Sequence, residues 1–376
     1  MKIISVGPYY PFRGGISTFN GLLCYHLRKK GYEVIPISFK RLYPGIFFPG
    51  KTQFEENISP ARNVSIRIID SLNPVSWYKA GKLIATMKPD LVIFHHWHSF
   101  FAPIYSRISS FLKRKTDCKL LVICHNIFPH EPNFFDKLFL KRFFNKLDGF
   151  ILLTGKLLEQ LNLLVDDPLY RISPHPLYNH FPDALDRQIA RYRLGIKEER
   201  VILYFGLVRE YKGIDYLIKS VDKICSVFPV RVLIVGEFYI DKNDFLKILE
   251  NVENKHLVTI VDRYVSDEEV SLYFSATDLI VLPYREATQS GVIKIAYHYD
   301  KPVVVTDVGG LREDVIDGKT GFVVPPMDVT KLSEAIIKFF NENYMNVFSN
   351  NIKRFKRKYS WNGLVSTILD LYSELR

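Results

Sequence analysis

The residues best placed to do chemistry lie between positions 278 and 310. Leu279–Leu282 is a short apolar run, long enough for one buried parallel strand. A polar loop with one acid, Glu286, follows it, and Ser290 and Gly291 then open an apolar helical stretch. In an open α/β sheet, ligands bind beyond the carboxyl ends of the strands, where helix N-termini offer N–H groups to anions. An acid beside such an anion site suggests a ligand that carries both a phosphate and sugar hydroxyls, although from spacing alone a solvated loop acid explains Glu286 equally well.

A turn that carries two cations follows the strand predicted at Val201–Phe205. In the sequence YFGLVREYKG, Arg209 and Lys212 stand three residues apart. Two fixed cations at a strand-to-helix turn can neutralise a diphosphate leaving group. The alternative is a solvated loop, because Lys and Arg side chains are usually exposed. The residues alone leave both interpretations open.

Gly14 and Gly15 stand between the first predicted strand and the first predicted helix. Glycine allows a positive φ and a close approach of the backbone to a ligand, and a helix start presents N–H groups. From the residues alone, a tight turn explains the pair better than a ligand site does. The dinucleotide fingerprint GxGxxG is absent, so no dinucleotide cofactor is expected.

Histidines end two of the predicted strands. His125 follows Leu120–Cys124, and His95, His96 and His98 follow Leu91–Phe94. A histidine at the carboxyl end of a strand is a site candidate in an α/β protein, although a lone one is more often a hydrogen-bonded structural residue. No acid or cysteine accompanies the cluster at a metal-binding spacing, so no metal site is expected.

Short apolar strands alternate with helical stretches along the whole chain, which is typical of parallel sheets. Strands are predicted in the first half at Lys2–Val6, Glu33–Ser38, Ser65–Ile69, Leu91–Phe94, Leu120–Cys124 and Phe150–Leu153. Strands are predicted in the second half at Val201–Phe205, Val232–Val235, Val258–Val261, Leu279–Leu282, Val303–Thr306 and Phe322–Val324. Helices are predicted at Ile16–Lys30, Phe100–Lys113, Asp215–Val227, Ser266–Ser275 and Trp361–Leu375. The polar segment Ser173–Asp186 separates the two halves.

The segment around Glu286 resembles the donor-binding region of retaining glycosyltransferases of family 4. The fold of that family is α/β, with two facing Rossmann-like domains (GT-B) and a final helix that crosses back to the N-terminal domain. The family pattern is an acid, seven residues and a second acid. Here the first acid is Glu286, whereas the residue eight positions later is Lys294. Because lysine only donates hydrogen bonds, we expect Lys294 to contact a ribose oxygen, to turn toward Glu286 or to reach a phosphate.

The resemblance implies roles for further residues. Lys212 matches the family pattern directly, whereas Arg209 replaces an arginine that the family places at the position of Leu207. The expected catalytic residues are His125, Glu286, Arg209 and Lys212, with His125 beside the anomeric centre. The expected donor-binding residues are Gly14, Gly15, Gly206, Tyr264, Val265, Gln289, Ser290, Gly291 and Lys294. His96 is expected on the acceptor side, and the backbone of Tyr264 and Val265 at the nucleotide base.

A length of 376 residues suits two domains better than one. We expect an acceptor-side domain at 1–180, a nucleotide-sugar-binding domain at 187–355 and a C-terminal helix at 356–376 that packs back on the first domain. No run of about 18 apolar residues occurs, and Met1–Val6 is already strand-like, so neither a transmembrane helix nor a signal peptide is expected. The four cysteines have no metal spacing and are expected to be reduced core residues of a cytosolic protein.

The net charge of +11 belongs entirely to the first half of the chain. Residues 1–180 contain 24 Lys and Arg against 12 Asp and Glu, whereas the remainder contains 27 against 28. Basic and aromatic residues alternate in two stretches, from Phe39 to Lys51 and from Phe134 to Lys146. Such stretches suit an anionic lipid surface and, in principle, nucleic acid. For the second stretch, an ordinary helix with a core face and a solvated basic face is the competing interpretation.

Together with the resemblance, these features predict a retaining, metal-independent glycosyltransferase without a cofactor. The donor is expected to be a nucleotide-diphosphate sugar of UDP or GDP type, and the acceptor a lipid-linked or polysaccharide intermediate. The basic first half predicts peripheral association with the cytoplasmic face of an anionic membrane. No nucleic-acid-binding motif accompanies the charge, so nucleic acid is not an expected partner. Two alternatives remain open: an inactive relative that acts as a binding or scaffold subunit, and a nucleotide-sugar epimerase.

Overall fold

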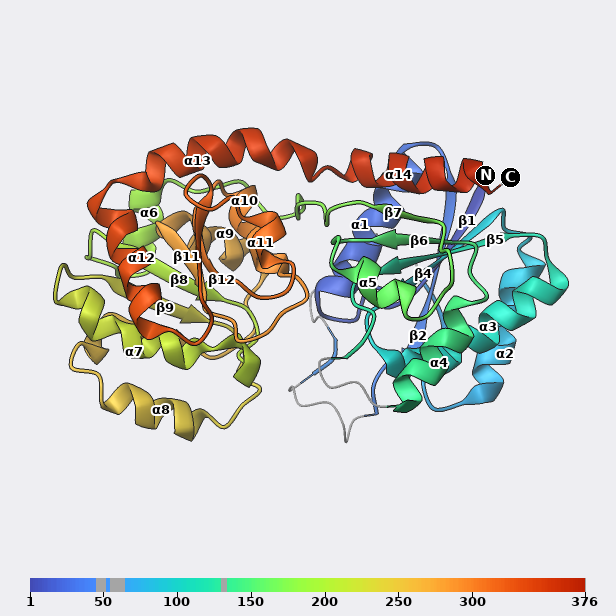
Figure 1. The fold of residues 1–376 in the computed structure, drawn as a ribbon, viewed down its shortest axis with the longest axis horizontal. Helices are drawn as coiled ribbons and strands as arrows, with labels where there is room; N and C mark the ends of the chain where they lie inside the picture. The colour runs from blue at the N-terminus through green and yellow to red at the C-terminus, as the bar shows by residue number, and fades with distance from the viewer. Residues whose placement is uncertain (45–51, 55–64, 130–133, 376) are drawn as a thin grey trace. The chain divides into compact units, whose positions relative to one another are not determined.

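The computed structural model describes residues 1–44, 52–54, 65–129 and 134–375. The chain divides into two compact units, which we call unit 1 (Met1–His175 with Ser360–Arg376) and unit 2 (Pro176–Tyr359). Each unit is built on one parallel sheet with helices packed against it (Figure 1). The predicted α/β class with two Rossmann-like domains is confirmed.

Within the described residues, the sheet of unit 1 has seven parallel strands in the order β3-β2-β1-β4-β5-β6-β7. They are β1 (Lys2–Val6), β2 (Glu33–Arg41), β3 (Ile66–Asp70), β4 (Leu91–His96), β5 (Lys119–Cys124), β6 (Gly149–Leu152) and β7 (Tyr170–Ile172). The central strands are buried on both faces, as their continuous apolar sequences predict. The strand order reverses between β1 and β4, and such a switch point is where open α/β sheets bind ligands.

Helices cover both faces of this sheet. The helices of unit 1 are α1 (Gly15–Lys29), α2 (Pro74–Thr86), α3 (Ala102–Lys115), α4 (Phe134–Phe144), α5 (Leu157–Asn162) and α14 (Trp361–Glu374). Successive residues of a strand point to opposite faces. In β4, Leu91 and Ile93 therefore pack with α1 and α14, whereas Val92 and Phe94 pack with α3 and α4. The C-terminal helix α14 thus completes the core of unit 1, as predicted.

The sheet of unit 2 has six parallel strands in the order β10-β9-β8-β11-β12-β13. They are β8 (Val201–Phe205), β9 (Arg231–Val235), β10 (Val258–Val261), β11 (Leu279–Leu282), β12 (Val303–Thr306) and β13 (Gly321–Val324). Its helices are α6 (Arg187–Arg193), α7 (Ile214–Cys225), α8 (Lys242–Glu250), α9 (Asp267–Ala276), α10 (Gly291–His298), α11 (Leu311–Asp314), α12 (Val329–Asn341) and α13 (Tyr344–Phe355). Here the strand order reverses between β8 and β11.

The predicted strands are present, and most of their ends lie within two residues of the prediction. β2 continues to Arg41 rather than ending at Ser38, and β7 was not predicted. The first boundary between the units, at His175, lies inside the separating segment Ser173–Asp186. Residues 45–51 of the first basic and aromatic stretch lie outside the described part of the chain, as do residues 55–64 and 130–133. In the ranges that are described, no helix is both long and apolar enough to span a membrane.

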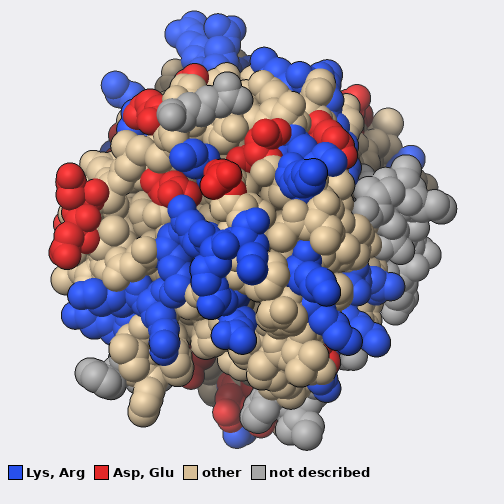
Figure 2. All heavy atoms as spheres, turned by 90° about the vertical axis from the view of Figure 1, so that its right-hand side faces the viewer, with Lys and Arg blue, Asp and Glu red and all other residues tan. Residues whose placement is uncertain are grey.

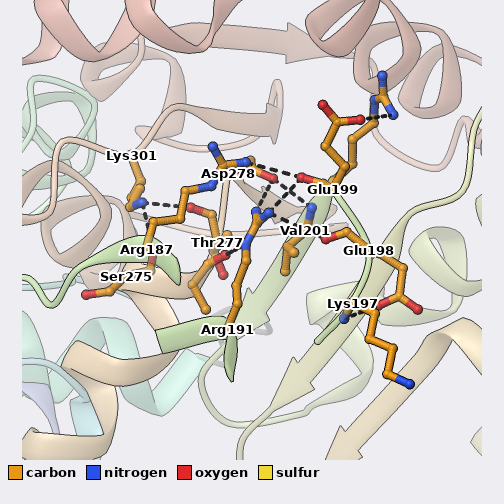
Figure 3. A network of polar contacts seen from close by, with 12 residues as sticks. Arg187, Arg191, Lys197, Glu198, Glu199, Val201, Ser275, Thr277, Asp278 and Lys301 are labelled. Carbon is orange, nitrogen blue, oxygen red and sulfur yellow. Dashed lines mark hydrogen bonds and ion pairs between the residues drawn. The ribbon is translucent and has the colours of Figure 1, made fainter. Parts of the chain in front are cut away.

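A buried acid ties the amino ends of β8 and β11 to α6. Asp278 precedes β11 and is 1% exposed, and Figure 3 shows two arginines of α6 pointing at it. Its carboxylate lies 2.6 Å from Arg191 Nη2 and 2.7 Å from Arg187 Nη2, and it accepts from the Val201 amide at 2.8 Å. Lys301 donates nearby to the Thr277 carbonyl at 2.7 Å, and burial lowers its pKa to about 8. This network fixes the two strands whose opposite ends carry the candidate site.

Candidate active site

The candidate site of unit 2 lies where the strand order reverses. β8 and β11 are neighbours there, and their carboxyl ends lead into the loops 206–213 and 283–290. Because both strands are parallel, both loops leave the sheet at the same edge. The first loop carries Arg209 and Lys212, and the second carries Glu286 and Ser290.

Direct contacts hold these two loops together. The Arg285 amide donates to the Tyr211 carbonyl at 2.7 Å, and Arg285 Nη2 lies 2.9 Å from Asp215 Oδ1 in α7. Gly213 has a φ of 61°, and a Cβ atom there would lie 2.0 Å from the Pro283 carbonyl oxygen. Both the backbone conformation and the close approach therefore require glycine at this position.

Lys212 reaches from the first loop to the second. Its ammonium lies 3.8 Å from the centroid of the Tyr284 ring. Burial lowers the pKa of Lys212 to about 8, and the charge of Arg209 contributes in the same direction. An anionic ligand would favour the charged form of such a lysine, because an opposite charge nearby raises the pKa again. Lys212 is therefore suited to bind a diphosphate.

Tyr284 connects Lys212 with the start of α10. The Tyr284 hydroxyl lies 3.3 Å from Ser290 Oγ, and Ser290 directly precedes Gly291, the first residue of the helix. The N–H groups of a first helical turn have no intrahelical acceptor, so they attract anions. A cation and a helix N-terminus thus belong to one connected group of residues.

Arg209 lies in the same loop as Lys212, but its side chain contacts a different aromatic ring. Its guanidinium is 5.0 Å from the centroid of the Tyr239 ring, and it borders a pocket of about 490 Å³. The charged lining of that pocket comprises two cations and four acids: Arg209, Arg285, Glu210, Asp215, Asp241 and Asp244. An excess of acids does not suit a diphosphate, so this pocket is not the predicted phosphate site.

Glu286 is exposed on a loop that is anchored from β12 and the turn after it. Thr306 Oγ1 donates to the Tyr284 carbonyl at 2.6 Å, and the Gly310 amide donates to the Thr288 carbonyl at 2.8 Å. These bonds lie on either side of Glu286 in the sequence. They hold the acid at the carboxyl edge of the sheet, where the sequence placed it.

The other predicted donor-binding residues of unit 2 lie in loops that follow strands. Gly206 follows β8 with a φ of 111°, and Gln289 is partly buried in the loop before α10. Tyr264 and Val265 stand between β10 and α9, with Tyr264 39% exposed and Val265 buried. Their roles remain predictions.

Lys294 has a different partner from those predicted. Its side chain is buried inside unit 2, where the ammonium pairs with the Asp314 carboxylate and lies 3.7 Å from the centroid of the Tyr359 ring. The Tyr359 hydroxyl donates to the same carboxylate at 3.1 Å. Burial lowers the pKa of Lys294, and Asp314 opposes that shift. Because the ammonium is enclosed by these groups, Lys294 contributes to the core of unit 2 and does not turn toward Glu286.

Unit 1 carries the remaining candidates. Gly14 precedes α1 with a φ of 110°, which glycine adopts without strain, and both Gly14 and Gly15 are exposed. His125 follows β5 and is 4% exposed. Its Nε2 lies 3.3 Å from His95 Nδ1, and the ring of Phe19 packs edge-on at 4.7 Å. Burial, followed by the nearby histidines, lowers the pKa of His125 well below its usual value, so its ring is neutral.

The two histidines at the end of β4 point to opposite faces of the sheet. His96 packs against Phe144 at 5.3 Å between ring centroids, and its Nε2 lies 3.1 Å from the Ile127 carbonyl oxygen. His96 therefore packs in the core of unit 1, and its predicted acceptor-side role stays a prediction. His95 lies on the same face as His125, although no role was predicted for it. Because successive residues of a strand point to opposite faces, the sequence of β4 alone could have shown that His95 and His96 lie on different faces.

The opposite orientations of His95 and His96 also prevent them from binding one metal ion together. Among the residues that the structure describes, no group of three or more His, Cys, Asp or Glu side chains is arranged to hold a metal ion. The four cysteines are free thiols, three of them buried.

Two family models match the chain, one in each unit. The model described as Glycosyltransferase Family 4 matches residues 13–174, and the model described as Glycosyl transferases group 1 matches residues 199–342. Each matched segment contains all the predicted site residues of its unit. The chain therefore belongs to the glycosyltransferases of family 4 and group 1.

Individual relatives agree with this assignment. An uncharacterized glycosyltransferase of Methanocaldococcus jannaschii is 25% identical over an alignment that covers 100% of this chain and 99% of the relative. The capsular polysaccharide biosynthesis glycosyltransferase CapM of Staphylococcus aureus is 29% identical over 45% of each chain. HepE of Anabaena, solved in complex with UDP, has a TM-score of 0.74 at 17% identity and is covered completely, which shows a shared fold. The protein is thus a glycosyltransferase.

Proposed function

We propose that the protein transfers a sugar from a nucleoside-diphosphate donor with retention of the anomeric configuration and without a metal ion. This proposal rests on the position of Lys212 at the switch point between β8 and β11. Its ammonium is held against Tyr284, close to the N-terminus of α10, with a pKa of about 8. A cation and a helix N-terminus together supply the charge that a metal ion supplies in other transferases.

The proposed roles follow from these positions. Lys212 stabilises the diphosphate as the bond from the anomeric carbon to the phosphate oxygen breaks. The leaving group takes the electron pair, and an acceptor oxygen adds to the same face of the sugar while its proton passes to the departing phosphate. Glu286 binds sugar hydroxyls, and His125 orients the sugar. Because the attack takes place within an ion pair, no nucleophilic carboxylate is needed.

The metal-independence of this scheme has a simple test. Transfer measured in EDTA should equal transfer measured in Mg²⁺, because protein groups neutralise the phosphates. A complete loss of activity in EDTA that Mg²⁺ or Mn²⁺ restores would contradict the proposed role of Lys212.

For the donor, we propose a UDP-sugar first and a GDP-sugar second. HepE, which shares the fold, was solved with UDP, and this favours uridine. Tyr264 and Val265 are proposed to contact the base through their backbone groups, which carry no side-chain code for its identity. A thermal-shift panel of nucleotides and nucleotide-sugars tests the choice, since a ligand at 100 times its Kd adds about 2.7 kcal/mol to stability.

For the acceptor, we propose a lipid-linked or polysaccharide intermediate at an anionic membrane surface. The relative CapM acts in capsular polysaccharide biosynthesis, which favours this class. The charge of the chain agrees with it, because unit 1 contains 25 Lys and Arg against 14 Asp and Glu, whereas unit 2 contains 26 of each. Figure 2 shows Lys and Arg gathered over the middle and lower part of one face.

Three adjacent helices of unit 1, α2, α3 and α4, form the surface that we propose for membrane contact. Their sequences contain nine Lys and Arg and one acid, Asp136. Exposed apolar side chains lie among these cations: Val75, Tyr78, Phe135, Leu138 and Phe139. Cations attract anionic headgroups, and exposed aromatic and aliphatic side chains enter the interface.

A groove of about 540 Å³ lies on this surface. Its lining includes Trp77 and Tyr78 from α2, Arg107 from α3, and Phe139 and Arg142 from α4. Apolar walls beside two arginines suit the boundary between a lipid phosphate and its acyl chains. We propose that this groove contacts anionic phospholipid.

Vesicle sedimentation tests the membrane proposal. The protein should bind vesicles of phosphatidylcholine and phosphatidylglycerol at about 2:1 and should not bind phosphatidylcholine alone. The double variant Arg107→Glu/Arg142→Glu should bind at least about 30-fold more weakly, since each cation contributes about 1 kcal/mol. The matched control is Lys247→Glu/Lys331→Glu, on exposed helices of unit 2. Equal losses in both variants would mean that net charge, and not this surface, determines binding.

A further inference from the structure

A chain of four buried polar side chains crosses the switch point of unit 1. Ser5 lies on β1, His95 on β4, Asn20 on α1, and His125 directly after β5. Ser5, Asn20 and His95 are 0% exposed and His125 is 4% exposed. Water is therefore largely excluded, and each group must satisfy its hydrogen bonds within the protein.

The direction of the first bonds is fixed by a backbone carbonyl. Asn20 Nδ2 donates to the Pro8 carbonyl oxygen at 2.9 Å. The reverse amide orientation would place two oxygens at that distance, so Asn20 Oδ1 must face Ser5 as an acceptor. Cys24 Sγ also donates to this oxygen at 3.5 Å. Burial raises the pKa of the Cys24 thiol to about 12, so it keeps its proton and remains a donor.

Ser5 has one hydroxyl proton, and two groups that can accept it, Asn20 Oδ1 and His95 Nε2, lie within 3.0 Å of its oxygen. Its Oγ lies 2.6 Å from Asn20 Oδ1 and 3.0 Å from His95 Nε2. Because Asn20 Oδ1 only accepts, the hydroxyl must donate to it, and the hydroxyl oxygen must accept from His95. His95 therefore carries its proton on Nε2. Burial lowers the pKa of His95 to about 3, so the ring is neutral and its Nδ1 holds a lone pair.

The contact between the two histidines determines which ring nitrogen of His125 carries the proton. Its Nε2 lies 3.3 Å from His95 Nδ1. Two lone pairs would repel each other across this distance, so His125 must carry its proton on Nε2. Because this ring is also neutral, its Nδ1 holds the lone pair and acts as an acceptor.

We propose that Asn20, Ser5 and His95 are positioning residues that set the tautomer of His125. His125 Nδ1 is then an acceptor and not a donor, so this nitrogen pairs only with donor groups. The effect of this tautomer on transfer rests on the proposed function, in which His125 orients the sugar. The relay itself rests only on the contacts within unit 1.

Nitrogen NMR of protein labelled with ¹⁵N-histidine tests the relay without any substrate. Protonated and unprotonated ring nitrogens have well-separated shifts, and His95→Gln and His125→Gln variants assign the two signals. We expect both rings to be neutral, with the proton on Nε2. A His125 ring that carries its proton on Nδ1 in the unaltered protein would overturn the proposal.

A matched pair of serine variants tests whether Ser5 sets the tautomers of the two histidines. Ser5→Ala removes the acceptor for His95 Nε2, so His95 and His125 should lose their single tautomers and kcat should fall about tenfold at unchanged donor KM. The control is Ser38→Ala, on the neighbouring strand β2, which is also 0% exposed and lies outside the relay. It should change neither the tautomers nor kcat. Unaltered tautomers in a folded Ser5→Ala variant would overturn the role of Ser5.

Activity of His125→Ala separates the relay from the proposed function. If the tautomers are as expected but His125→Ala transfers sugar at the unaltered rate, His125 does not contact the sugar. The relay would then stand as a structural feature, and the role of His125 in transfer would be overturned.

Discussion

Raising the pH should weaken donor binding through Lys212. The pKa of this ammonium is about 8 in the unliganded protein, chiefly because it is buried. The protonated fraction therefore falls from about 97% at pH 6.5 to about 24% at pH 8.5. If the diphosphate binds the charged form, affinity is greatest below pH 8 and falls about fourfold over this range. The diphosphate of a nucleotide-sugar is esterified at both ends and does not titrate here, so the change belongs to the protein.

Isothermal titration calorimetry measures this effect directly. The nucleotide-sugar is titrated from pH 6.5 to 8.5, and at pH 8 in two buffers with different ionisation enthalpies. Binding should take up about half a proton at pH 8, because the phosphates raise the pKa of Lys212. In Lys212→Arg the side chain stays charged, so both the pH dependence and the proton uptake should disappear. The free nucleoside, which has no phosphates, should bind with the same affinity throughout.

Two results would refute this reasoning. One is an affinity for the nucleotide-sugar that does not change between pH 6.5 and 8.5. The other is the same pH dependence in Lys212→Arg as in the unaltered protein, which would assign the titration to another group.

Three further substitutions have defined outcomes. Glu286→Gln should lower kcat/KM by at least about 100-fold with little change in Tm, because the acid is exposed and is proposed to bind the sugar hydroxyls. Unaltered kinetics would remove it from the site. Asp278→Asn should cost about 3–5 kcal/mol in urea unfolding, because it leaves Arg191 in the interior without its carboxylate; a loss below about 1 kcal/mol would contradict the role given to this network. Lys294→Glu should also destabilise the protein, because it places a second carboxylate beside the buried Asp314. The charge swap Lys294→Asp/Asp314→Lys should recover part of the lost stability. A swap variant as unstable as Lys294→Glu would count against the pairing.

The fold was predictable because its signals are local. β11 is an apolar run that Pro283 ends, and β8 is an apolar run that Gly206 ends. β7 carried no such signal, because Tyr170–Ile172 has two half-buried residues and one exposed residue at the edge of its sheet. Strand order and the switch points follow from long-range pairing, which the sequence shows only through the resemblance.

The candidate site was predictable as a location but not as a set of contacts. Glu286 and Lys212 lie at the sheet edge where the sequence placed them, because parallel strands bring their loops together. The partner of Lys294 is Asp314, 20 residues further along the chain, and no local pattern connects the two. Tyr284 was not selected either, although its ring links Lys212 to Ser290.

His95 was missed for a different reason. The alternation of β4 already separates His95 from His96, because Leu91 and Ile93 share one face and Val92 and Phe94 share the other. Following that pattern one step further places His95 with His125. The bond directions through Ser5 and Asn20, in contrast, depend on distances that only the structure provides.

The most direct test of the central claim is the release of nucleoside diphosphate from a panel of UDP- and GDP-sugars by the purified protein. We predict that at least one donor is turned over, slowly with water and faster with a membrane lipid extract as acceptor, at the same rate in EDTA. Lys212→Ala and Glu286→Gln should both abolish this release while the proteins remain folded. Release that persists unchanged in both variants, or a protein that neither binds nor turns over any nucleotide-sugar, would contradict the site and the function proposed for it.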